Sequence, residues 1–229
     1  DGDEAHHMLN VKRHKAGDSV ILFNGEGAEC VGEIHEVCHE RVPHNKKAKI
    51  SIKSAKNVNK EIGFEITVAV SAPKGKRSDF IIQKCSELGV KEIIPIITER
   101  SVVRVDSGHK LEKWKRIAVE ASKQCGRNMI TEISNVMPFQ SLTDLIRSFE
   151  LSIIFSNNET AQGTKEVFKK SSGIKNVLCI IGPEGGFSTS EIEQAQNAGC
   201  KIAILTPQVL RVETAVIAVV SMLIYEYTF

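Results

Sequence analysis

IGPEGGFS, residues 181–188, is the stretch that decides the fold of this 229-residue chain. It ends an apolar run, VLCII at 177–181, of the kind that forms a buried parallel strand. Ser188 and Glu191 match the capping-box pattern, so a helix is expected to begin there, and Gly199 is placed to end it. The stretch therefore predicts a strand, a glycine-rich loop and a helix in direct succession.

The glycines in this loop allow its backbone to approach a ligand closely. Gly182, Gly185 and Gly186 permit positive φ, and the N–H groups before a helix can bind oxygen atoms of a polar or anionic ligand. Pro183 stiffens the turn. The spacing matches neither the dinucleotide-binding fingerprint nor the P-loop. Two interpretations stand at this point: a cofactor-binding loop of another kind, or an ordinary strand-to-helix turn, in which glycine and proline are common.

A second loop, VLRVETA at residues 209–215, also follows an apolar segment and opens a helix. Strand and helix patterns alternate from residue 64 onward, which predicts an α/β fold with a parallel sheet covered on both faces. Ligands in such sheets bind outside the carboxyl ends of the strands, where both loops lie. Strands are expected at 64–71, 92–98, near 132, 151–156, 176–181 and 201–206, and helices at 78–88, 109–126, 141–149, 162–170, 188–198 and 212–226.

Residues 19–58 have a different, turn-rich β pattern. Strand-like segments lie at 20–23, 30–37 and 49–52, and Asn24-Gly25 is a strong hairpin signal. This pattern predicts a small β-barrel in front of the α/β region. We expect the two domains to span residues 1–62 and 63–229.

Several short motifs, each present once, follow one another along nearly the whole chain. They are His6-His7, 11–13, Lys74-Gly75, 82–84, 87–89, 124–128, 181–186, Leu210-Arg211 and Glu213-Thr214. This series resembles the RsmE family of 16S rRNA uridine-N3 methyltransferases, in the SPOUT superfamily. The resemblance implies a PUA-like RNA-binding β-barrel, then an α/β SPOUT domain with a C-terminal trefoil knot. It also implies methyl transfer from S-adenosylmethionine to N3 of a specific uridine in small-subunit rRNA.

The chemistry of this reaction points to residues near the predicted site. Glu184 and Glu213 are the acidic residues nearest to it, and Glu213 is already favourable with the dipole of the last helix. Arg211 and Glu184 are the expected catalytic residues: Glu184 assists loss of the N3 proton, and Arg211 stabilises the uracil oxyanion or contacts the target phosphate. Alternatively, Glu184 binds backbone N–H groups or the cofactor, and Arg211 forms a salt bridge with Glu213 or Glu184. The expected cofactor-binding residues are Ile181, Gly182, Glu184, Gly185, Gly186, Leu205, Thr206, Val209, Leu210, Thr214 and Ala215.

The chain departs from the family pattern at a few positions. Thr206 and Gln208 stand where the family has glycine and arginine, and Lys12 stands where it has leucine. The chain begins at Asp1 without methionine, so we expect that a leader or the first strand of the amino-terminal domain is missing. These departures keep two alternatives open: a SPOUT methyltransferase acting on a different RNA or base atom, and a non-catalytic RNA-binding relative.

Local basic clusters, not the net charge of +2, are the candidates for RNA contact. The expected RNA-binding residues are Arg13, Lys74, Lys76, Arg77 and Arg127, with a solvated charged surface as the alternative for any one of them. The superfamily resemblance further implies a homodimer. The residues expected at its interface lie on the last helix: Val216, Val219, Val220 and Leu223.

Other site classes lack support in the sequence. The six cysteines form no C-x-x-C pair, which favours reduced and mostly buried thiols; for Cys125 a packing role is favoured over a nucleophilic one. His6-His7 lack metal-ligand partners at the right spacing beyond a local Asp3-Glu4, so no metal is expected. The apolar stretch 215–224 is too short to span a bilayer, and no signal peptide is visible. We therefore expect a cytoplasmic protein without a membrane partner.

Overall fold

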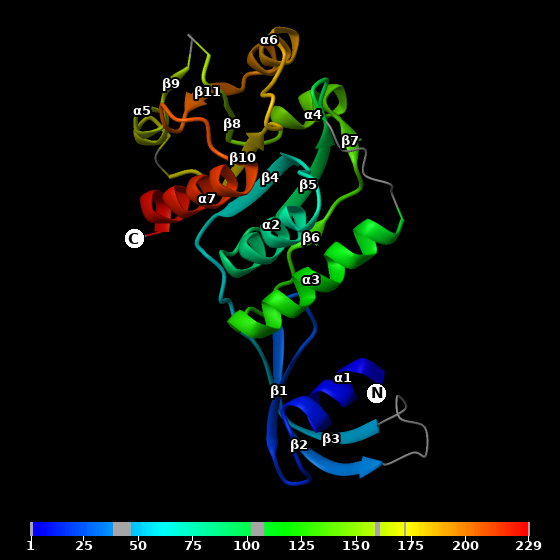
Figure 1. Cartoon of the computed structure of the whole chain (residues 1–229). Helices are drawn as coiled ribbons and strands as arrows, with labels where there is room; N and C mark the ends of the chain where they lie inside the picture. The colour runs from blue at the N-terminus through cyan, green and yellow to red at the C-terminus, as the bar shows by residue number, and fades with distance from the viewer. Residues whose placement is uncertain (1, 39–46, 102–107, 159–160, 172, 229) are drawn as a thin grey trace. The chain divides into compact units, whose positions relative to one another are not determined.

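The chain divides into two compact units, residues 1–60 and residues 61–229. A computed structural model of the chain describes residues 2–38, 47–101, 108–158, 161–171 and 173–228 (Figure 1). Each unit is described below by itself.

The first unit is a helix and a three-stranded antiparallel sheet of order β1-β2-β3. Asn24 closes the β1–β2 hairpin, because its side-chain oxygen accepts hydrogen bonds from the backbone N–H of Glu26 (2.9 Å) and Ala28 (3.0 Å). The expected hairpin at Asn24-Gly25 is thus confirmed. The described strands form an open sheet and not a closed barrel. The elements are α1 (Gly2–His6), the π-helix η1 (His7–Val11), β1 (Ser19–Phe23), β2 (Ala28–Cys38) and β3 (Lys47–Asn57).

The second unit is built on a parallel sheet of order β6-β5-β4-β10-β8-β11-β9, with β7 paired to β5. The predicted alternation of strands and helices is confirmed. Its strands are β4 (Glu65–Ser71), β5 (Glu92–Ile97), β6 (Glu132–Ile133), β7 (Met137–Pro138), β8 (Leu151–Phe155), β9 (Gln162–Gly163), β10 (Asn176–Ile181) and β11 (Lys201–Ile204). Its helices are α2 (Lys76–Glu87), α3 (His109–Cys125), α4 (Phe139–Ile146), α5 (Thr164–Lys169), α6 (Thr189–Asn197) and α7 (Val212–Thr228).

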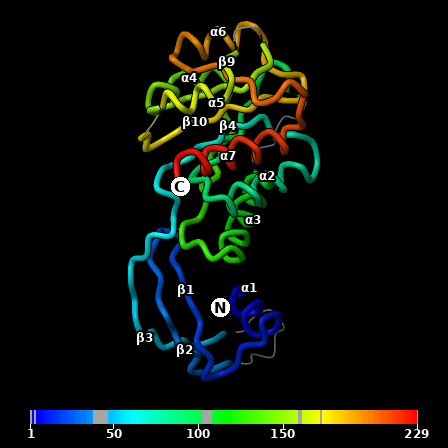
Figure 2. Tube along the Cα trace, turned by 90° about the vertical axis from the view of Figure 1, so that its left-hand side faces the viewer, coloured from blue at the N-terminus to red at the C-terminus, as the bar shows by residue number. Residues whose placement is uncertain are grey.

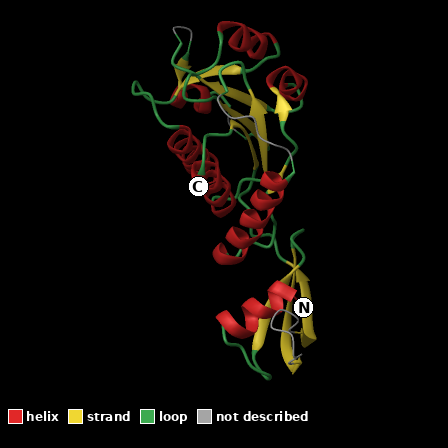
Figure 3. Ribbon diagram, turned by 45° about the vertical axis from the view of Figure 1, so that its right-hand side comes forward, coloured by secondary structure: helices red, strands yellow, loops and turns green. Residues whose placement is uncertain are grey.

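Helices cover both faces of this sheet (Figure 3). Alternate residues of β10 enter different cores: Val177 and Cys179 pack with residues of α2, α3 and α7, whereas Leu178 and Ile180 pack with residues of α4 and α6. Figure 2 shows the same division, with α4 and α6 on one side of β10 and α2, α3 and α7 on the other. Because β10 is buried on both faces, it reads as a continuous apolar run in the sequence.

The final helix, α7, belongs to the core of its own chain. Val216, Val219, Val220 and Leu223 are all fully buried there, next to strands β4 and β10 and helix α2. The prediction that these four side chains form a contact between subunits is therefore wrong. The sequence suggested an interface because apolar residues of this helix lie on more than one of its faces, which a single narrow contact with the core would not require. The trefoil knot implied by the resemblance stays a prediction.

Candidate cofactor site

A cavity of about 340 Å³ lies where strands β8, β10 and β11 end. Both loops singled out in the sequence line it, which brings residues 181–187 together with residues 205–215. Of the expected cofactor-binding residues, Ile181, Gly182, Glu184, Gly185, Gly186, Leu205, Thr206, Val209, Leu210 and Ala215 line the cavity. Thr214 does not line it and is exposed on α7.

Glycine is required at two positions of the first loop for different reasons. A Cβ on Gly182 would lie 2.9 Å from the ring of Phe187, which is closer than real side chains approach. Gly186 has φ of +70°, in the left-handed region that costs an L-residue about 1–2 kcal/mol. Its N–H donates to the Pro183 carbonyl at 2.8 Å and closes a tight turn. Phe187 packs on Phe139 of α4, so the loop is held by the core.

Helix α6 begins directly behind this loop, as the capping-box pattern predicts. The Ser188 hydroxyl accepts from the N–H of Glu191, and the Glu191 carboxylate accepts from the N–H of Ser188. Glu191 is only 2% exposed, and its second oxygen accepts from the backbone N–H of Glu99 at 2.9 Å. The cap therefore also ties the cofactor loop to the segment that follows β5.

The two departures from the family pattern interact with each other in the second loop. The Thr206 hydroxyl and the Gln208 side-chain carbonyl are hydrogen-bonded, and the N–H of Gln208 donates to the Thr206 hydroxyl at 3.4 Å. Both residues line the cavity. These hydrogen bonds form a local turn within the second loop.

Sequence reasoning missed the residues that reach the cavity from neighbouring strands. Arg100 follows β5, and Phe155 to Asn158 end or follow β8. A usable signal was present: SNN at 156–158 is a polar run directly after a buried strand, at the edge where parallel sheets bind ligands. The strand order, which places β8 between β10 and β11, makes that signal interpretable.

Glu184, an expected catalytic residue, lies in an ion pair. Its carboxylate accepts from the Arg77 guanidinium at 2.8 Å, and both side chains are partly exposed. This contact brings the KGKR segment, residues 74–77, next to the cofactor loop. Lys74 and Lys76 are exposed in the same segment.

Arg211 is exposed at the start of α7, between the cavity-lining residues Leu210 and Val212. Neither salt bridge considered from the sequence forms. Glu184 pairs with Arg77 instead, and the buried Oε2 of Glu213 has no hydrogen-bond partner within the described residues. Among the described residues, the exposed Arg211 thus forms no salt bridge with either glutamate.

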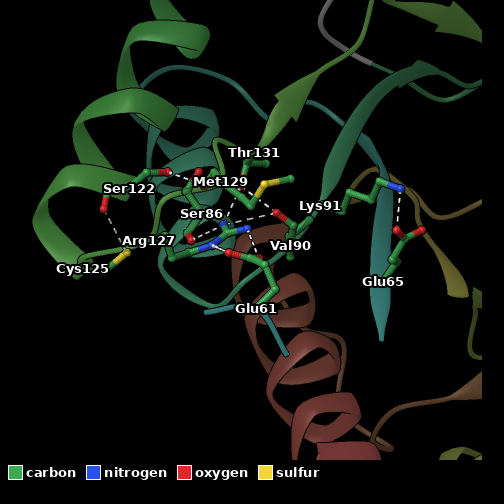
Figure 4. Close-up of polar contacts among 10 residues, drawn as sticks. All are labelled: Glu61, Glu65, Ser86, Val90, Lys91, Ser122, Cys125, Arg127, Met129 and Thr131. Carbon is green, nitrogen blue, oxygen red and sulfur yellow. Dashed lines mark hydrogen bonds and ion pairs between the residues drawn. The ribbon is translucent and has the colours of Figure 1, made fainter. Parts of the chain in front are cut away.

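The remaining two expected RNA-binding residues differ in exposure. Arg13 is exposed in the first unit and has φ of +59°, an uncommon conformation for a non-glycine residue. Arg127 is only 8% exposed, and its guanidinium is occupied by Glu61 and by groups on neighbouring elements (Figure 4). The structure therefore contradicts the prediction that Arg127 binds RNA. A basic residue looks the same in the sequence whether its partner is a phosphate or a carboxylate.

Three cysteines of the second unit are buried, and their thiols are hard to ionise. Burial raises the pKa of the Cys85 and Cys200 thiols to about 12, and it also raises the pKa of Cys179. Cys125 is exposed, which corrects the packing role expected for it; its thiol donates to the Ser122 carbonyl. Within the described ranges, no cluster of three or more potential metal ligands occurs, and no helix has the length and hydropathy needed to cross a membrane.

Comparisons with known proteins give this site its context. The RNA methyltransferase domain family matches residues 60–224, and the RNA methyltransferase PUA domain family matches residues 1–37. Ribosomal RNA small subunit methyltransferase E of Bacillus subtilis is 32% identical over 232 residues, which cover 98% of this chain and 88% of the relative. The same enzyme of Aquifex aeolicus is 36% identical over 229 residues, which cover 91% of this chain and 95% of the relative. The chain belongs to this RNA methyltransferase family. The resemblance to the RsmE family drawn from the motifs is thereby confirmed.

Solved methyltransferase structures match the fold. A methyltransferase from Legionella pneumophila, solved in complex with SAM, has a TM-score of 0.86 at 32% identity and covers 97% of this chain and 89% of its own. The ribosomal RNA small subunit methyltransferase E of Neisseria gonorrhoeae, bound to S-adenosylmethionine, has a TM-score of 0.85 at 29% identity. The match covers 99% of this chain and 90% of the Neisseria chain. The PUA-like unit followed by an α/β methyltransferase domain agrees with the sequence prediction.

Proposed function

We propose that this protein uses S-adenosylmethionine to methylate N3 of a specific uridine in 16S rRNA, in the cytoplasm and without a metal ion. The observation that carries the proposal is the meeting of the IGPEGG loop and the 205–215 loop around one cavity, in a chain of this family. Two relatives were solved with that cofactor. We assign cofactor binding to a domain of residues 63–229 and RNA holding to residues 1–62 together with the KGKR segment.

The cavity fits a cofactor of this kind. Its volume, about 340 Å³, lies within the range of small-molecule sites. The absence of a side chain at Gly182 and Gly185 lets backbone groups approach a ligand, while Ser156, Asn157 and Asn158 supply hydrogen-bonding side chains. Apolar walls from Leu205 and Phe155 complete the lining. This combination suits a ligand with a nucleoside part and an amino-acid part.

Two residues of the chain, Arg211 and Glu184, would help the uracil base to accept the methyl group. Bound S-adenosylmethionine supplies an electrophilic methyl group, and N3 becomes a good nucleophile only when it loses its proton. Arg211, whose donors have no carboxylate partner in the part of the chain that the structure describes, would stabilise the negative charge that then develops on the uracil oxygens. Glu184 would assist proton removal after exchanging its contact with Arg77. Holding the base in line with the methyl group supplies much of the rate.

One experiment tests the reaction as a whole. The protein is incubated with labelled S-adenosylmethionine and small ribosomal subunits from cells that lack the enzyme, and the rRNA is digested to nucleosides. Labelled 3-methyluridine is the expected product. Label in another nucleoside or another RNA would favour a different SPOUT activity, and firm RNA binding without any label would favour the non-catalytic alternative.

Replacing Gly185 by valine is expected to weaken S-adenosylmethionine binding by about 5- to 150-fold, since overpacking costs about 1–3 kcal/mol. The fold should survive, because Gly185 has no positive φ and a Cβ there makes only ordinary contact with Arg100 at 3.5 Å. Calorimetric titration measures the affinity. Gly63→Val is the matched control, because Gly63 is exposed and a Cβ there meets nothing within 4 Å. Equal affinities of the Gly185 variant and wild type would exclude this cavity.

Arg77→Ala and Arg13→Ala are expected to weaken RNA binding. The slope of the logarithm of the binding constant against the logarithm of the salt concentration should become shallower by about one unit per lost phosphate contact. Cofactor affinity should change little for Arg13→Ala. Binding to the target rRNA segment is measured over a range of salt concentrations. Lys91→Ala is the control: Lys91 is similarly exposed but pairs with Glu65, at the ends of β4 and β5 opposite the cavity. An unchanged slope for both arginine variants contradicts the assignment.

We also propose a homodimer formed through the exposed side of α7. Thr214, Ser221 and Tyr225 are exposed there at helical spacing, and Tyr225 is 79% exposed. Tyr225→Lys is expected to sediment as a monomer with unchanged thermal stability, because this side chain adds little to the core. Sedimentation of the wild-type protein as a monomer at micromolar concentration would rule the dimer out.

A further inference from the structure

Arg100 is the one cationic residue among the described residues that line the cavity. Its Nη1 donates to the carbonyl oxygen of Gly185 at 2.9 Å. Gly185 occupies the turn that the Gly186 N–H closes on the Pro183 carbonyl. A hydrogen bond from a charged donor to this carbonyl fixes the orientation of the peptide between Gly185 and Gly186.

Arg100 projects from a rigid turn. The N–H of Ser101 donates to the Thr98 carbonyl at 3.0 Å, and the N–H of Thr98 donates to the Ser101 hydroxyl at 2.8 Å. The same hydroxyl lies 2.9 Å from the hydroxyl of Ser71, the last residue of β4. The turn is therefore closed on itself and attached to the central part of the sheet.

Glu191 joins this turn to the cofactor loop a second time. One carboxylate oxygen accepts from the N–H of Glu99, beside Arg100, and the other accepts from the N–H of Ser188, at the end of the cofactor loop. Each bond is 2.9 Å long, and Glu191 is almost fully buried. Arg100 and Glu191 thus connect the same two segments at different points.

We propose that Arg100 is a positioning residue for cofactor binding: by holding the Gly185 carbonyl from the Glu191-anchored turn, it fixes the Pro183–Gly186 turn in its binding conformation. This inference rests on the proposed function. A segment with two adjacent glycines has many backbone conformations, and binding must otherwise supply the free energy that orders them. Arg100 orders the turn before the ligand arrives, so its effect belongs to affinity for the cofactor.

The first test is calorimetric titration of Arg100→Ala and Arg100→Lys with S-adenosylmethionine, with no RNA present. We expect Arg100→Ala to bind about tenfold more weakly, since it loses one hydrogen bond from a charged donor. Arg100→Lys should recover most of the affinity, because an ammonium also donates one such bond. Thermal stability should stay at the wild-type value in both, as Arg100 is exposed. Arg116→Ala, an exposed arginine on α3, is the control and should match wild type.

The second test uses Glu191→Gln, whose side chain keeps its shape but can accept through only one oxygen. It should also weaken cofactor binding, and the double variant Arg100→Ala/Glu191→Gln should lose less than the product of the two separate losses. Glu193→Gln, exposed on the same helix, is the control.

The outcomes separate the inference from the function on which it rests. Unchanged cofactor affinity in Arg100→Ala overturns the positioning role, and lower turnover on RNA with unchanged cofactor affinity overturns it in favour of an RNA contact. Fully independent losses in the double variant show that the two residues do not act on one loop. Failure of the wild-type protein itself to bind S-adenosylmethionine rejects the proposed function instead.

Discussion

Arg127→Ala is expected to lower the free energy of unfolding by up to about 3–5 kcal/mol, the cost of removing one partner from a buried ion pair, since the Arg127 side chain is 9% exposed and that of Glu61 is 23% exposed. For a domain of this size, that loss corresponds to a fall in melting temperature of roughly 6–20 °C. The Arg127 guanidinium binds the Glu61 carboxylate through both Nε (3.1 Å) and Nη2 (2.5 Å). Its Nη1 donates to the Ser86 carbonyl at 2.7 Å and to the Thr131 hydroxyl at 3.0 Å. The substitution removes the Arg127 donors from the Glu61 carboxylate and from the Ser86 carbonyl, which also accepts from the N–H of Gly89 at 3.4 Å (Figure 4).

Thermal and denaturant unfolding of the full chain measure this effect. Arg127→Lys should be intermediate, because a lysine keeps the charge but cannot form the two-pronged contact. Loss of both partners in Glu61→Ala/Arg127→Ala should cost less than the sum of the single losses, since each single variant already removes the interaction that the two residues share. Arg116→Ala, on the exposed side of α3, should leave stability unchanged. Wild-type stability of Arg127→Ala with weakened RNA binding would restore the role expected from the sequence.

Arg211→Ala is expected to reduce methyl transfer on saturating RNA and S-adenosylmethionine by about 10²–10³-fold, the usual effect of removing one donor to a developing oxyanion. The side chain is exposed beside the cavity lining, and neither Glu184 nor Glu213 is its partner. A group that acts on charge developing in the reaction changes turnover more than binding. Affinities for RNA and cofactor should therefore change little.

Single-turnover kinetics with labelled S-adenosylmethionine and saturating small subunits measure the effect. Arg211→Lys should retain part of the rate, since the charge remains while the planar fork of donors is lost. Arg77→Ala is the informative comparison, because it should reduce RNA affinity more than the rate at saturation. A wild-type rate for Arg211→Ala would remove this residue from the catalytic assignment.

The order and type of the elements in the second unit could be predicted because their signals are local. The strand at 176–181 is apolar on both faces, and the helix at 109–126 carries an apolar stripe at three- and four-residue spacing. The short strand β9 was missed and was included in the helix that follows it, because two residues show no period. The cofactor cavity could also be anticipated, since parallel strands bring their carboxyl ends to one edge.

The burial and the interaction partners of individual side chains were harder to predict. Arg127 and Arg77 are both basic residues close to glycine in the sequence, yet one is buried against Glu61 and the other is only partly buried beside Glu184. Val220 and Tyr225 share one apolar helix, but the first is in the core and the second is exposed. Residue type does not distinguish these outcomes.

By itself, the sequence determined the family, the alternation of strands and helices, and the two loops of the cofactor cavity, because periodicity, capping and glycine spacing act over a few residues. Tertiary structure alone decided which partners each charged group has. The Arg127–Glu61, Arg100–Gly185 and Arg77–Glu184 contacts join residues 66, 85 and 107 positions apart. Such partners meet only when the sheet order brings distant segments together, and the free energy of burying or pairing a charge depends on that meeting.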